Sequence, residues 1–356
     1  MKFKIEKNIL ENIISMVQPF LEKKDNSTIT SHILLKIIES KLLIRSTDYE
    51  ISLEIKNINV EDSIDGIGTI NGSNLLGILK RLKNSEINIE KKDQNIIINQ
   101  NKSNFKLPSY DHKEYPNIEN IENMDSLNIN SIDLMNSIKK ITPSIDNNNP
   151  KFELNGALID IEDNKISFVS TDTRRLSISN LNNRSNKIKK IIIPKKAIIE
   201  IQKLFIEDSK IVYDETTLII YNDNIKFSTK LINGNFPDYK RIIPTNLKNN
   251  LNLNKDLMIE SIKLITSIFS NIKITFNKNS ILFESLDENS ESKTQVDINL
   301  NIEKEFYIAV NAKYILDFLN LTNSKNIKIG FNESNMPFYL EEDNFFTIIM
   351  PIILEK

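Results

Sequence analysis

Few residues in this sequence have side chains that could carry out chemistry. There is no cysteine, which excludes disulfides, thiolate nucleophiles and cysteine-bound zinc. The two histidines, His32 and His112, lie far apart in the sequence and have no evident partner. The acidic stretch Asp160, Glu162 and Asp163 could hold a magnesium ion. A strand edge followed by a turn explains this stretch better, so we expect no metal site.

Enzyme motifs are also absent from the sequence. It contains no P-loop, no Gly-x-Gly-x-x-Gly fingerprint and no Gly-x-Ser-x-Gly elbow. We therefore expect no catalytic residue and no cofactor. A metal-dependent hydrolase that uses the acidic stretch is the alternative from the enzyme class.

Basic residues gather on the outer faces of several predicted helices. Apolar residues at positions 75, 78, 79 and 82 form the core stripe of one such helix, which leaves Lys80, Arg81 and Lys83 outside the core. The same pattern exposes Lys139, Lys140, Lys195, Lys196 and Lys203 on two further helices. Because the formal net charge is only -2, with 46 basic and 48 acidic residues, the acids must lie elsewhere. These faces could contact phosphates without reading bases, although ordinary solvated helix faces would have the same pattern.

One sequence pattern occurs three times. An apolar strand, the residues Ser-Thr-Asp and a second strand occupy positions 41–55, and residues 165–178 repeat them. A weaker copy begins at Ser280. The central serines Ser46, Ser170 and Ser285 are about 120 residues apart, which is about a third of the 356-residue chain. Because the following acids Asp48, Asp172 and Asp287 recur threefold, we interpret them as turn residues.

Other elements keep the same register. A helical apolar period appears early in each third, at residues 9–20, 134–145 and 257–269. A second amphipathic helix follows in each third, at residues 74–82, 197–205 and 313–321. Each third ends in further strands, with Pro116, Pro237 and Pro351 at corresponding places. The sequence therefore predicts three α+β domains of one fold, spanning residues 1–123, 124–246 and 247–356.

The N-terminal sequence gives an expectation about location. Charges interrupt each apolar run of MKFKIEKNILENIISMV, so we expect no signal peptide. No stretch of 18 apolar residues occurs anywhere, so we expect no membrane span. A cytoplasmic protein without a membrane partner fits these features best.

Three motifs resemble a known family. The residues TDTRRL from Thr171, FPDYKRIIP from Phe236 and MPI from Met350 resemble the bacterial DNA polymerase III beta subunits, the sliding clamps of replication. The opening MKFKIEK, TDYE at Thr47 and LNG at Leu154 are similar too, so the resemblance covers the whole chain.

The resemblance implies a fold and a function. Members of that family are head-to-tail homodimeric rings of six similar clamp domains, with helices inside and antiparallel sheets outside. The implied function is to encircle duplex DNA non-specifically and to give a polymerase processivity without catalysis. The implied partners are duplex DNA, the DNA polymerase III alpha subunit, the clamp loader and other clamp-binding replication and repair proteins.

The resemblance also implies three sets of site residues. The peptide-binding cleft would contain Leu154, Thr171, Thr173, Arg174, Arg175, Leu176, Pro237, Arg241, Ile242, Met350, Pro351 and Ile352. The DNA-facing residues would be Lys24, Lys80, Arg81, Lys83, Lys139, Lys140, Lys196 and Lys203. The dimer contact would join Phe105 and Leu107 to Ile268 and Phe269 of the second subunit.

Some positions depart from the family pattern. Thr173 and Arg174 stand where the family usually has Gly and His, and Glu153 replaces a frequent aromatic residue. The changes at Thr173 and Arg174 would alter the shape and charge of the cleft rim, and the change at Glu153 would weaken a DNA contact near the middle domain. A second class of function, a monomeric repeat protein that captures peptides without encircling DNA, is distinguished from the clamp by its oligomeric state.

Overall fold

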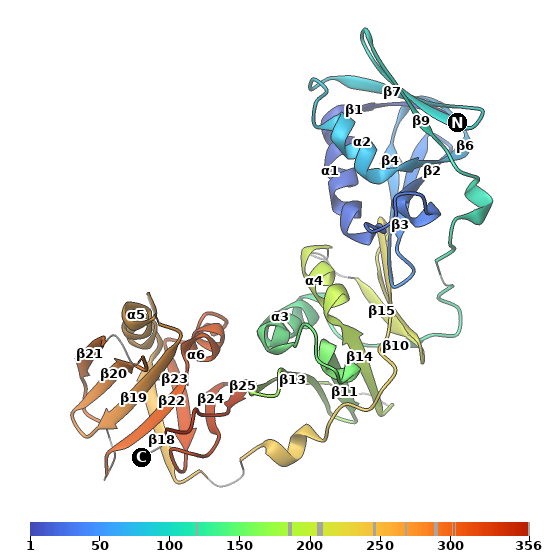
Figure 1. Cartoon of the computed structure of the whole chain (residues 1–356). Helices are drawn as coiled ribbons and strands as arrows, with labels where there is room; N and C mark the ends of the chain where they lie inside the picture. The colour runs from blue at the N-terminus through green and yellow to red at the C-terminus, as the bar shows by residue number, and fades with distance from the viewer. Residues whose placement is uncertain are drawn as a thin grey trace. The chain divides into compact units, whose positions relative to one another are not determined.

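The computed structural model describes residues 1–118, 120–183, 187–204, 209–244, 247–267, 269–287, 291–300, 302 and 304–354. The chain divides into two compact units (Figure 1). Unit 1 contains residues 1–131 and 203–231, and unit 2 contains residues 132–202 and 232–356. No described helix is long and apolar enough to cross a membrane.

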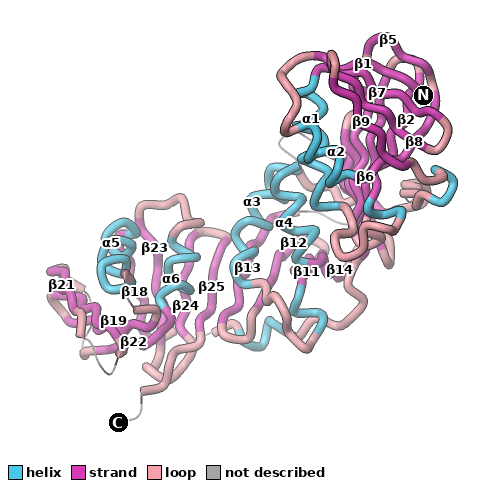
Figure 2. Tube along the Cα trace, turned by 45° about the horizontal axis from the view of Figure 1, so that its top comes forward, coloured by secondary structure: helices cyan, strands magenta, loops and turns pink. Residues whose placement is uncertain are grey.

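Unit 1 has two antiparallel sheets and a pair of helices. One sheet has the order β5 (Glu61–Ile64), β1 (Lys2–Glu6), β7 (Glu86–Lys92), β8 (Asn95–Gln100) and β9 (Ser103–Pro108). The other has the order β10 (Asp125–Ser126), β15 (Lys210–Tyr213), β16 (Thr217–Tyr221), β17 (Ile225–Lys230), β4 (Ile51–Asn59), β3 (Lys41–Thr47), β2 (His32–Ile38) and β6 (Gly66–Asn71). The helices α1 (Lys7–Val17) and α2 (Gly72–Leu79) lie side by side, as both tube and ribbon views show (Figures 1 and 2).

Unit 2 also has two antiparallel sheets, but its described residues form four α-helices. Its larger sheet, called sheet C below, has the order β14 (Lys189–Pro194), β11 (Gly156–Glu162), β12 (Lys165–Thr171), β13 (Arg175–Asn182), β25 (Phe345–Ile349), β24 (Phe338–Glu342), β23 (Asn326–Phe331) and β18 (Asn249–Asn254). The smaller sheet has the order β21 (Lys293–Asp297), β20 (Ser280–Ser285), β19 (Asn271–Asn277) and β22 (Phe306–Asn311). The α-helices are α3 (Ser131–Ile141), α4 (Lys195–Leu204), α5 (Lys255–Thr266) and α6 (Ala312–Leu319), and the bounds of α3 and α4 extend slightly into unit 1. Short 3₁₀ helices are η4 (Thr142–Ser144), η5 (Phe152–Asn155) and η6 (Tyr239–Ile242).

The six predicted helices are all confirmed, and asparagine begins three of them in the same way. Asn71, Asn254 and Asn311 are each the last residue of a strand. Their side chains accept a backbone N–H from the first turn of α2, α5 and α6, respectively. Such a cap satisfies an amide that has no partner inside the helix. The helix therefore starts directly where the strand ends.

The turn after Ser-Thr is built identically in two repeats. The carboxylate of Asp48 accepts the amides of Glu50 and Ile51, and that of Asp172 accepts the amides of Arg174 and Arg175. The structural role predicted for these two acids is thus confirmed. In the third copy residues 288–290 fall outside the described residues, so the turn that follows Asp287 is not compared.

Two sheets continue across the predicted repeat boundaries. Strand β17 pairs with β4 in unit 1, and β25 pairs with β13 in unit 2. The two junctions have the same register. Phe227 lies opposite Leu53, which in turn lies opposite Ser46 of the repeat. Thr347 lies opposite Ser177, which lies opposite the equivalent Ser170. The compact units follow these continuous sheets and so divide the middle third between them. The domain boundaries predicted from the sequence are a different division and stay a prediction.

The cores follow the period-two and helical patterns of the sequence. Strand β19 buries Ile272, Ile274 and Phe276 completely, against the buried faces of α5 and α6. The ring centroids of Phe306 and Phe331 lie 3.9 Å apart in the same core. Aromatic stacking adds to the area that these side chains remove from water.

His32 makes unit 1 sensitive to acid. Its side chain is buried, stacks on Tyr110 and lacks a hydrogen-bond partner at Nδ1 among the described residues. Burial lowers the pKa of His32 from its ordinary 6.5 to about 4. Between these values the unfolded chain binds a proton that the folded chain does not, so stability is lost as the pH falls from 6.5 toward 4. We expect this loss to be at most about 1.4 kcal/mol per pH unit.

Denaturant unfolding at pH 7 and pH 5 measures the effect. The variant His32→Phe keeps an aromatic ring for Tyr110 and should lose less stability on acidification than the parent protein. The control variant His112→Phe, which removes the other histidine, should behave like the parent. Equal acid sensitivity in His32→Phe and the parent would contradict the assignment.

Candidate functional site

Strand β13 sends adjacent side chains to opposite faces of sheet C. Leu176 packs with Tyr239 and Ile348 on the face that we call the outer face. Arg175, one residue earlier, reaches Pro143 and Asp317 on the opposite face, which we call the helix face. This follows from the pleat of a strand. The sequence motif TDTRRL therefore serves both faces of the sheet.

The outer face is covered by the connecting segment 232–244. Buried residues of five strands form an apolar cluster with Tyr239 from this segment, and Phe236 and Ile243 pack against it. The strand residues of the cluster are Leu158, Val169, Leu176, Ile178, Ile192 and Ile348. The buried part of the segment thus belongs to the core of unit 2, while Pro237, Arg241 and Ile242 remain exposed.

Polar contacts hold the same segment. The hydroxyl of Tyr239 donates to Oδ2 of Asp160 at 2.9 Å, and Nζ of Lys240 lies 3.8 Å from the same oxygen. Lys240 also pairs with Glu162, and this hydrogen bond lowers the pKa of the Glu162 carboxyl and raises that of the Lys240 amine. Burial raises the pKa of Tyr239. We call these four residues the outer-face clasp.

The predicted cleft residues lie in four segments with different exposure. Leu154 in η5 and Leu176 in β13 are buried, with 2% and 3% of their surfaces exposed. Pro237, Arg241, Ile242, Thr173, Arg174 and Met350 are exposed, and Thr171, Pro351 and Ile352 are half-buried. The amide of Met350 donates to the carbonyl of Arg174 at 2.8 Å, so the C-terminal segment lies directly beside the turn after β12.

Two local constraints explain residues of the motifs. A side chain at Gly156, the glycine of Leu-Asn-Gly, would place its Cβ 2.5 Å from the carbonyl oxygen of Ile193. Only glycine fits there without movement of the backbone. Thr173 has a φ of 70°, a left-handed conformation that β-branched residues rarely adopt. A glycine would adopt it freely, so the threonine strains this turn.

Arg175 is an internal residue. Its guanidinium donates to Asp172 at 3.0 Å, to Asp317 of α6 at 2.7 Å and to the carbonyl of Pro143, and it lies 4.5 Å from the ring centroid of Tyr314. The side chain is only 4% exposed. A planar guanidinium suits this arrangement because it can donate in several directions at once. Arg175 therefore joins its own turn to α6 and to the end of η4.

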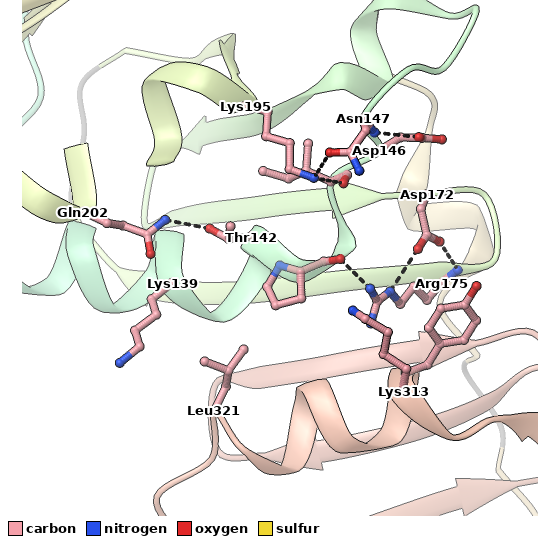
Figure 3. Close-up of a pocket in the computed structure, with 13 residues that line it drawn as sticks. Lys139, Thr142, Asp146, Asn147, Asp172, Arg175, Lys195, Gln202, Lys313 and Leu321 are labelled. Atoms are coloured by element: carbon pink, nitrogen blue, oxygen red, sulfur yellow. Dashed lines mark hydrogen bonds and ion pairs between the residues drawn. The ribbon is translucent and has the colours of Figure 1, made fainter. Parts of the chain in front are cut away.

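A cavity of 590 Å³ adjoins Arg175 on the helix face (Figure 3). Its polar lining includes Lys195, whose amine donates to the carbonyl of Ile145 at 2.7 Å and to Oδ1 of Asn147 at 2.6 Å. Burial lowers the pKa of this amine. Lys195 is thus half-buried and bound within the fold, although the helical pattern predicted an exposed side chain.

The predicted DNA-facing residues differ in how they are held. Lys80, Arg81 and Lys83 follow the end of α2, are exposed and make no side-chain ion pair or hydrogen bond within the described part of the chain. Lys24 and Lys139 are exposed in the same way, and Lys196 and Lys203 are exposed on α4. Lys140 is half-buried, 5.4 Å from the ring centroid of Phe345 and 3.5 Å from Oδ1 of Asn344.

The acidic stretch on β11 has a structural explanation. Asp160 is 1% exposed and bound by Tyr239 and Lys240, and Glu162 is bound by Lys240. The described residues contain no group of three His, Asp or Glu side chains placed to hold a metal ion. Asp160 and Glu162 are thus bound within the fold, as expected for structural residues.

The predicted dimer residues are partly described. Phe105 and Leu107 are half-buried on β9, which is an edge strand, and Phe269 is half-buried after α5. Ile268 lies outside the described residues. Strand β21, at the edge of the smaller sheet of unit 2, is not among the residues that the motifs predicted.

Comparisons with known proteins agree along the whole chain. Residues 1–119, 128–238 and 240–353 match the models of the N-terminal, central and C-terminal domains of the DNA polymerase III beta subunit. The beta sliding clamp of Helicobacter pylori is 40% identical over 374 residues, covering 99% of this chain and 100% of that protein, and that of Haemophilus influenzae is 26% identical. The crystal structure of the H. pylori beta clamp bound to a DNA ligase peptide has a TM-score of 0.94 at 41% identity, covering 99% of this chain and 100% of that chain. The Pseudomonas aeruginosa subunit, at 22% identity and a TM-score of 0.89, has the same fold.

Three matched domains of helices and antiparallel sheets define a protein of the DNA-clamp class. Within that class the chain belongs to the family of bacterial DNA polymerase III beta subunits, the beta sliding clamps. Members of this family form ring dimers, and they are processivity factors that catalyse no reaction themselves. The protein is accordingly a sliding clamp of DNA replication.

The outer-face clasp was missed in the sequence, although a signal for it exists. Asp160 stands in the strand GALIDIE on the same face as the buried Leu158, and the residues before it in this strand are apolar. A carboxylate on a buried face needs a hydrogen-bond partner. That rule predicts a donor from elsewhere in the chain, but it does not identify Tyr239, which is 79 positions away.

Replacement of Arg175 tests its internal role. The variant Arg175→Met should lose about 2–3 kcal/mol of unfolding free energy, because Asp172 and Asp317 would keep their charges without this partner. Denaturant unfolding measures the loss. The neighbouring variant Arg174→Met removes an exposed arginine and should change stability by less than about 0.5 kcal/mol. Equal effects of the two substitutions would show that Arg175 does not hold the turn.

Proposed function

We propose that the outer face of sheet C, together with segment 232–244 and the C-terminal segment from Met350, binds short linear peptides of other replication and repair proteins. The observation that carries this proposal is a group of apolar side chains left exposed beside a buried apolar cluster. Ile242, Met350 and Ile353 are 48%, 43% and 71% exposed. Exposed apolar side chains of this kind are typical contact sites for a partner.

Charges at the rim would orient such a peptide. Arg174 is exposed and has no side-chain partner among the described residues, and Arg241 pairs only with the exposed Asp238 at 2.8 Å. Rim charges contribute more to orientation and association rate than to affinity. The buried Leu176 and Leu154 would form the floor of the site, and Arg175 would position the turn that carries Thr173 and Arg174.

The partners that we propose follow from the family. They are the DNA polymerase III alpha subunit, the clamp loader and other clamp-binding proteins of replication and repair. The H. pylori clamp that is 41% identical binds a DNA ligase peptide, which supports a peptide-binding site in this chain. A cytoplasmic location would follow, because a replication protein acts on the bacterial chromosome, which lies in the cytoplasm.

Duplex DNA is the second proposed ligand. The exposed cations Lys24, Lys80, Arg81, Lys83 and Lys139 have no ion-pair partners among the described residues, and Lys140, Lys196 and Lys203 would supplement them. Long exposed lysines can contact phosphates without a fixed geometry and without reading bases. A closed ring needs only such weak contacts, because encirclement and not affinity keeps DNA bound.

We also propose how two subunits close the ring. The last strand of the second repeat, β17, pairs with β4, and the last strand of the third, β25, pairs with β13. The corresponding strands that remain are β9 and β21, and both lie at sheet edges. Pairing β9 of one subunit with β21 of the other would repeat the same junction and satisfy both edges. Phe105, Leu107 and Phe269 would then lie near this junction.

The internal junctions also supply a register for this contact. Phe105 corresponds to Phe227 and Thr347, because each lies on the last strand of its repeat at the same distance from the preceding hairpin turn. Ser292 lies opposite Ser285 in the third repeat. Leu53 lies opposite Ser46 in the first repeat, and Ser177 lies opposite Ser170 in the second, so these three positions correspond. Phe105 would therefore lie opposite Ser292 of the partner subunit. One position along, the exposed Lys106 would lie opposite the exposed Glu291 of the partner subunit.

Fluorescence anisotropy of a labelled peptide with Gln and Leu-Phe anchors tests the peptide site. Wild-type protein should bind it saturably, and Ile242→Ala together with Arg241→Ala should weaken binding at least about tenfold, as expected for removal of an anchor and a rim charge. The control variant Ile199→Ala removes an isoleucine of α4 that is 38% exposed, and it should bind normally. Leu176→Ala is less suitable, since it would also open a cavity in the core.

A charge reversal tests the ring. Lys106→Glu and Glu291→Lys should each weaken the dimer about tenfold, since two symmetry-related contacts would each place like charges opposite one another. The double variant restores opposite charges and should dimerise like the parent protein. Sedimentation equilibrium measures these constants. A double variant as weak as the single variants would contradict the register.

A further inference from the structure

We propose that Tyr239 is a positioning residue for peptide binding: by its hydrogen bond to Asp160 it fixes the place of Arg241 and Ile242 on the outer face. This inference rests on the proposed peptide site. Tyr239 itself is 4% exposed and is therefore not placed to touch a peptide. Its effect would be exerted through the segment 232–244 that carries the exposed residues.

The backbone of this segment explains why a side chain has to hold it. The amide of Ile232 donates to the carbonyl of Ile192 on β14 at 2.9 Å. The described backbone hydrogen bonds after that point are local, from Arg241 to Asp238 and from Ile243 to Lys240. Pairing with sheet C resumes at β18, with Asn249 opposite Phe331. Between these points the ladder of the sheet does not locate the segment.

Two consecutive residues of the segment bind one buried carboxylate. Tyr239 donates to Oδ2 of Asp160 at 2.9 Å, and Nζ of Lys240 lies 3.8 Å from that oxygen. Asp160 is 1% exposed, so burial strengthens the bond from Tyr239, whereas solvent partly screens the half-exposed Lys240. Lys240 extends the attachment to Glu162 on the same strand. Since β11 lies inside the sheet, between β14 and β12, it gives the clasp a fixed base.

The clasp is directly connected to the proposed peptide site. The ring of Tyr239 belongs to the apolar cluster that contains Leu176 and Ile348, the residues below the exposed site. Arg241 and Ile242 follow Tyr239 within the same short helix, η6. A shift of Tyr239 would therefore move the rim charge and the apolar anchor together. Pre-organisation of this kind lowers the cost of ordering a site when a ligand binds.

The test compares two tyrosine variants that each remove one buried hydroxyl. Tyr239→Phe keeps the ring in the cluster and removes the hydroxyl that bonds to Asp160 and contacts Ser167. Tyr115→Phe is the matched control: Tyr115 is also 4% exposed, and its hydroxyl donates to the carbonyls of His32 and Arg45 in unit 1. Both variants are measured as full-length dimers for peptide anisotropy, for unfolding and for amide hydrogen exchange in residues 233–244.

We expect Tyr239→Phe to bind the peptide about threefold to tenfold more weakly, as loss of one hydrogen bond implies. Amide exchange in residues 233–244 should become faster, because local opening becomes easier. Tyr115→Phe should lose stability without either change. A second variant, Asp160→Asn, keeps an oxygen that can accept the Tyr239 hydroxyl, so it should bind more tightly than Tyr239→Phe.

The outcomes separate this inference from the proposed site. If the wild-type protein binds no peptide, the proposed site fails and the inference fails with it. If the wild type binds and Tyr239→Phe binds equally well, only the positioning role is overturned. Faster exchange in residues 233–244 with unchanged affinity would overturn it too. Faster exchange together with weaker binding, absent in Tyr115→Phe, supports it.

Discussion

Pairing of strands across repeat boundaries is the constraint on which the rest of the structure depends. The last strand of a repeat has an edge of backbone groups without hydrogen-bond partners inside that repeat. Strand β17 pairs this edge with β4 of the preceding repeat, and β25 pairs its edge with β13 in the same way. The sheets of eight strands arise in this way, and each compact unit is organised around one of them. In a chain of three such repeats, two of these edges have no partner within the chain. They are the edge of the last strand of the first repeat, β9, and the edge of the corresponding strand of the third repeat, β21. The closure that we propose through a second subunit would use the same interaction that joins the repeats.

The two faces of sheet C have separate tasks because a strand alternates its side chains. On β13, Leu176 enters the outer cluster beneath the proposed peptide site, and Arg175 ties the turn to α6 and η4 on the helix face. Adjacent residues of one motif are thus bound to different parts of unit 2. Replacement of Leu176 would therefore affect the outer face, and replacement of Arg175 would affect the helix face, although the two residues are neighbours in the sequence. This explains why the motif contains both a buried apolar residue and a buried arginine.

Much of the fold could be predicted from the sequence, because its signals are local. Helical periods located α1 to α6, and the Ser-Thr-Asp pattern located the turns at Asp48 and Asp172. The partners of buried polar groups could not be predicted in this way. Tyr239 bonds to Asp160, which is 79 positions away, and Arg175 bonds to Asp317, which is 142 positions away. Such pairs are determined by how strands are ordered in the sheet, and a single sequence contains no periodic signal for that order.

The cations of this protein divide according to how they are held, and we propose that this division matters for contact with DNA. Arg175 and Lys195 each have several acceptors and are fixed within unit 2. Lys80, Arg81 and Lys83 have no such partners among the described residues and keep their side-chain freedom. A fixed cation can position a turn or a helix, but it would hold a phosphate at one point and oppose sliding. Mobile, exposed cations lose little entropy on each contact and exchange one phosphate for the next, which is the property that movement along DNA requires.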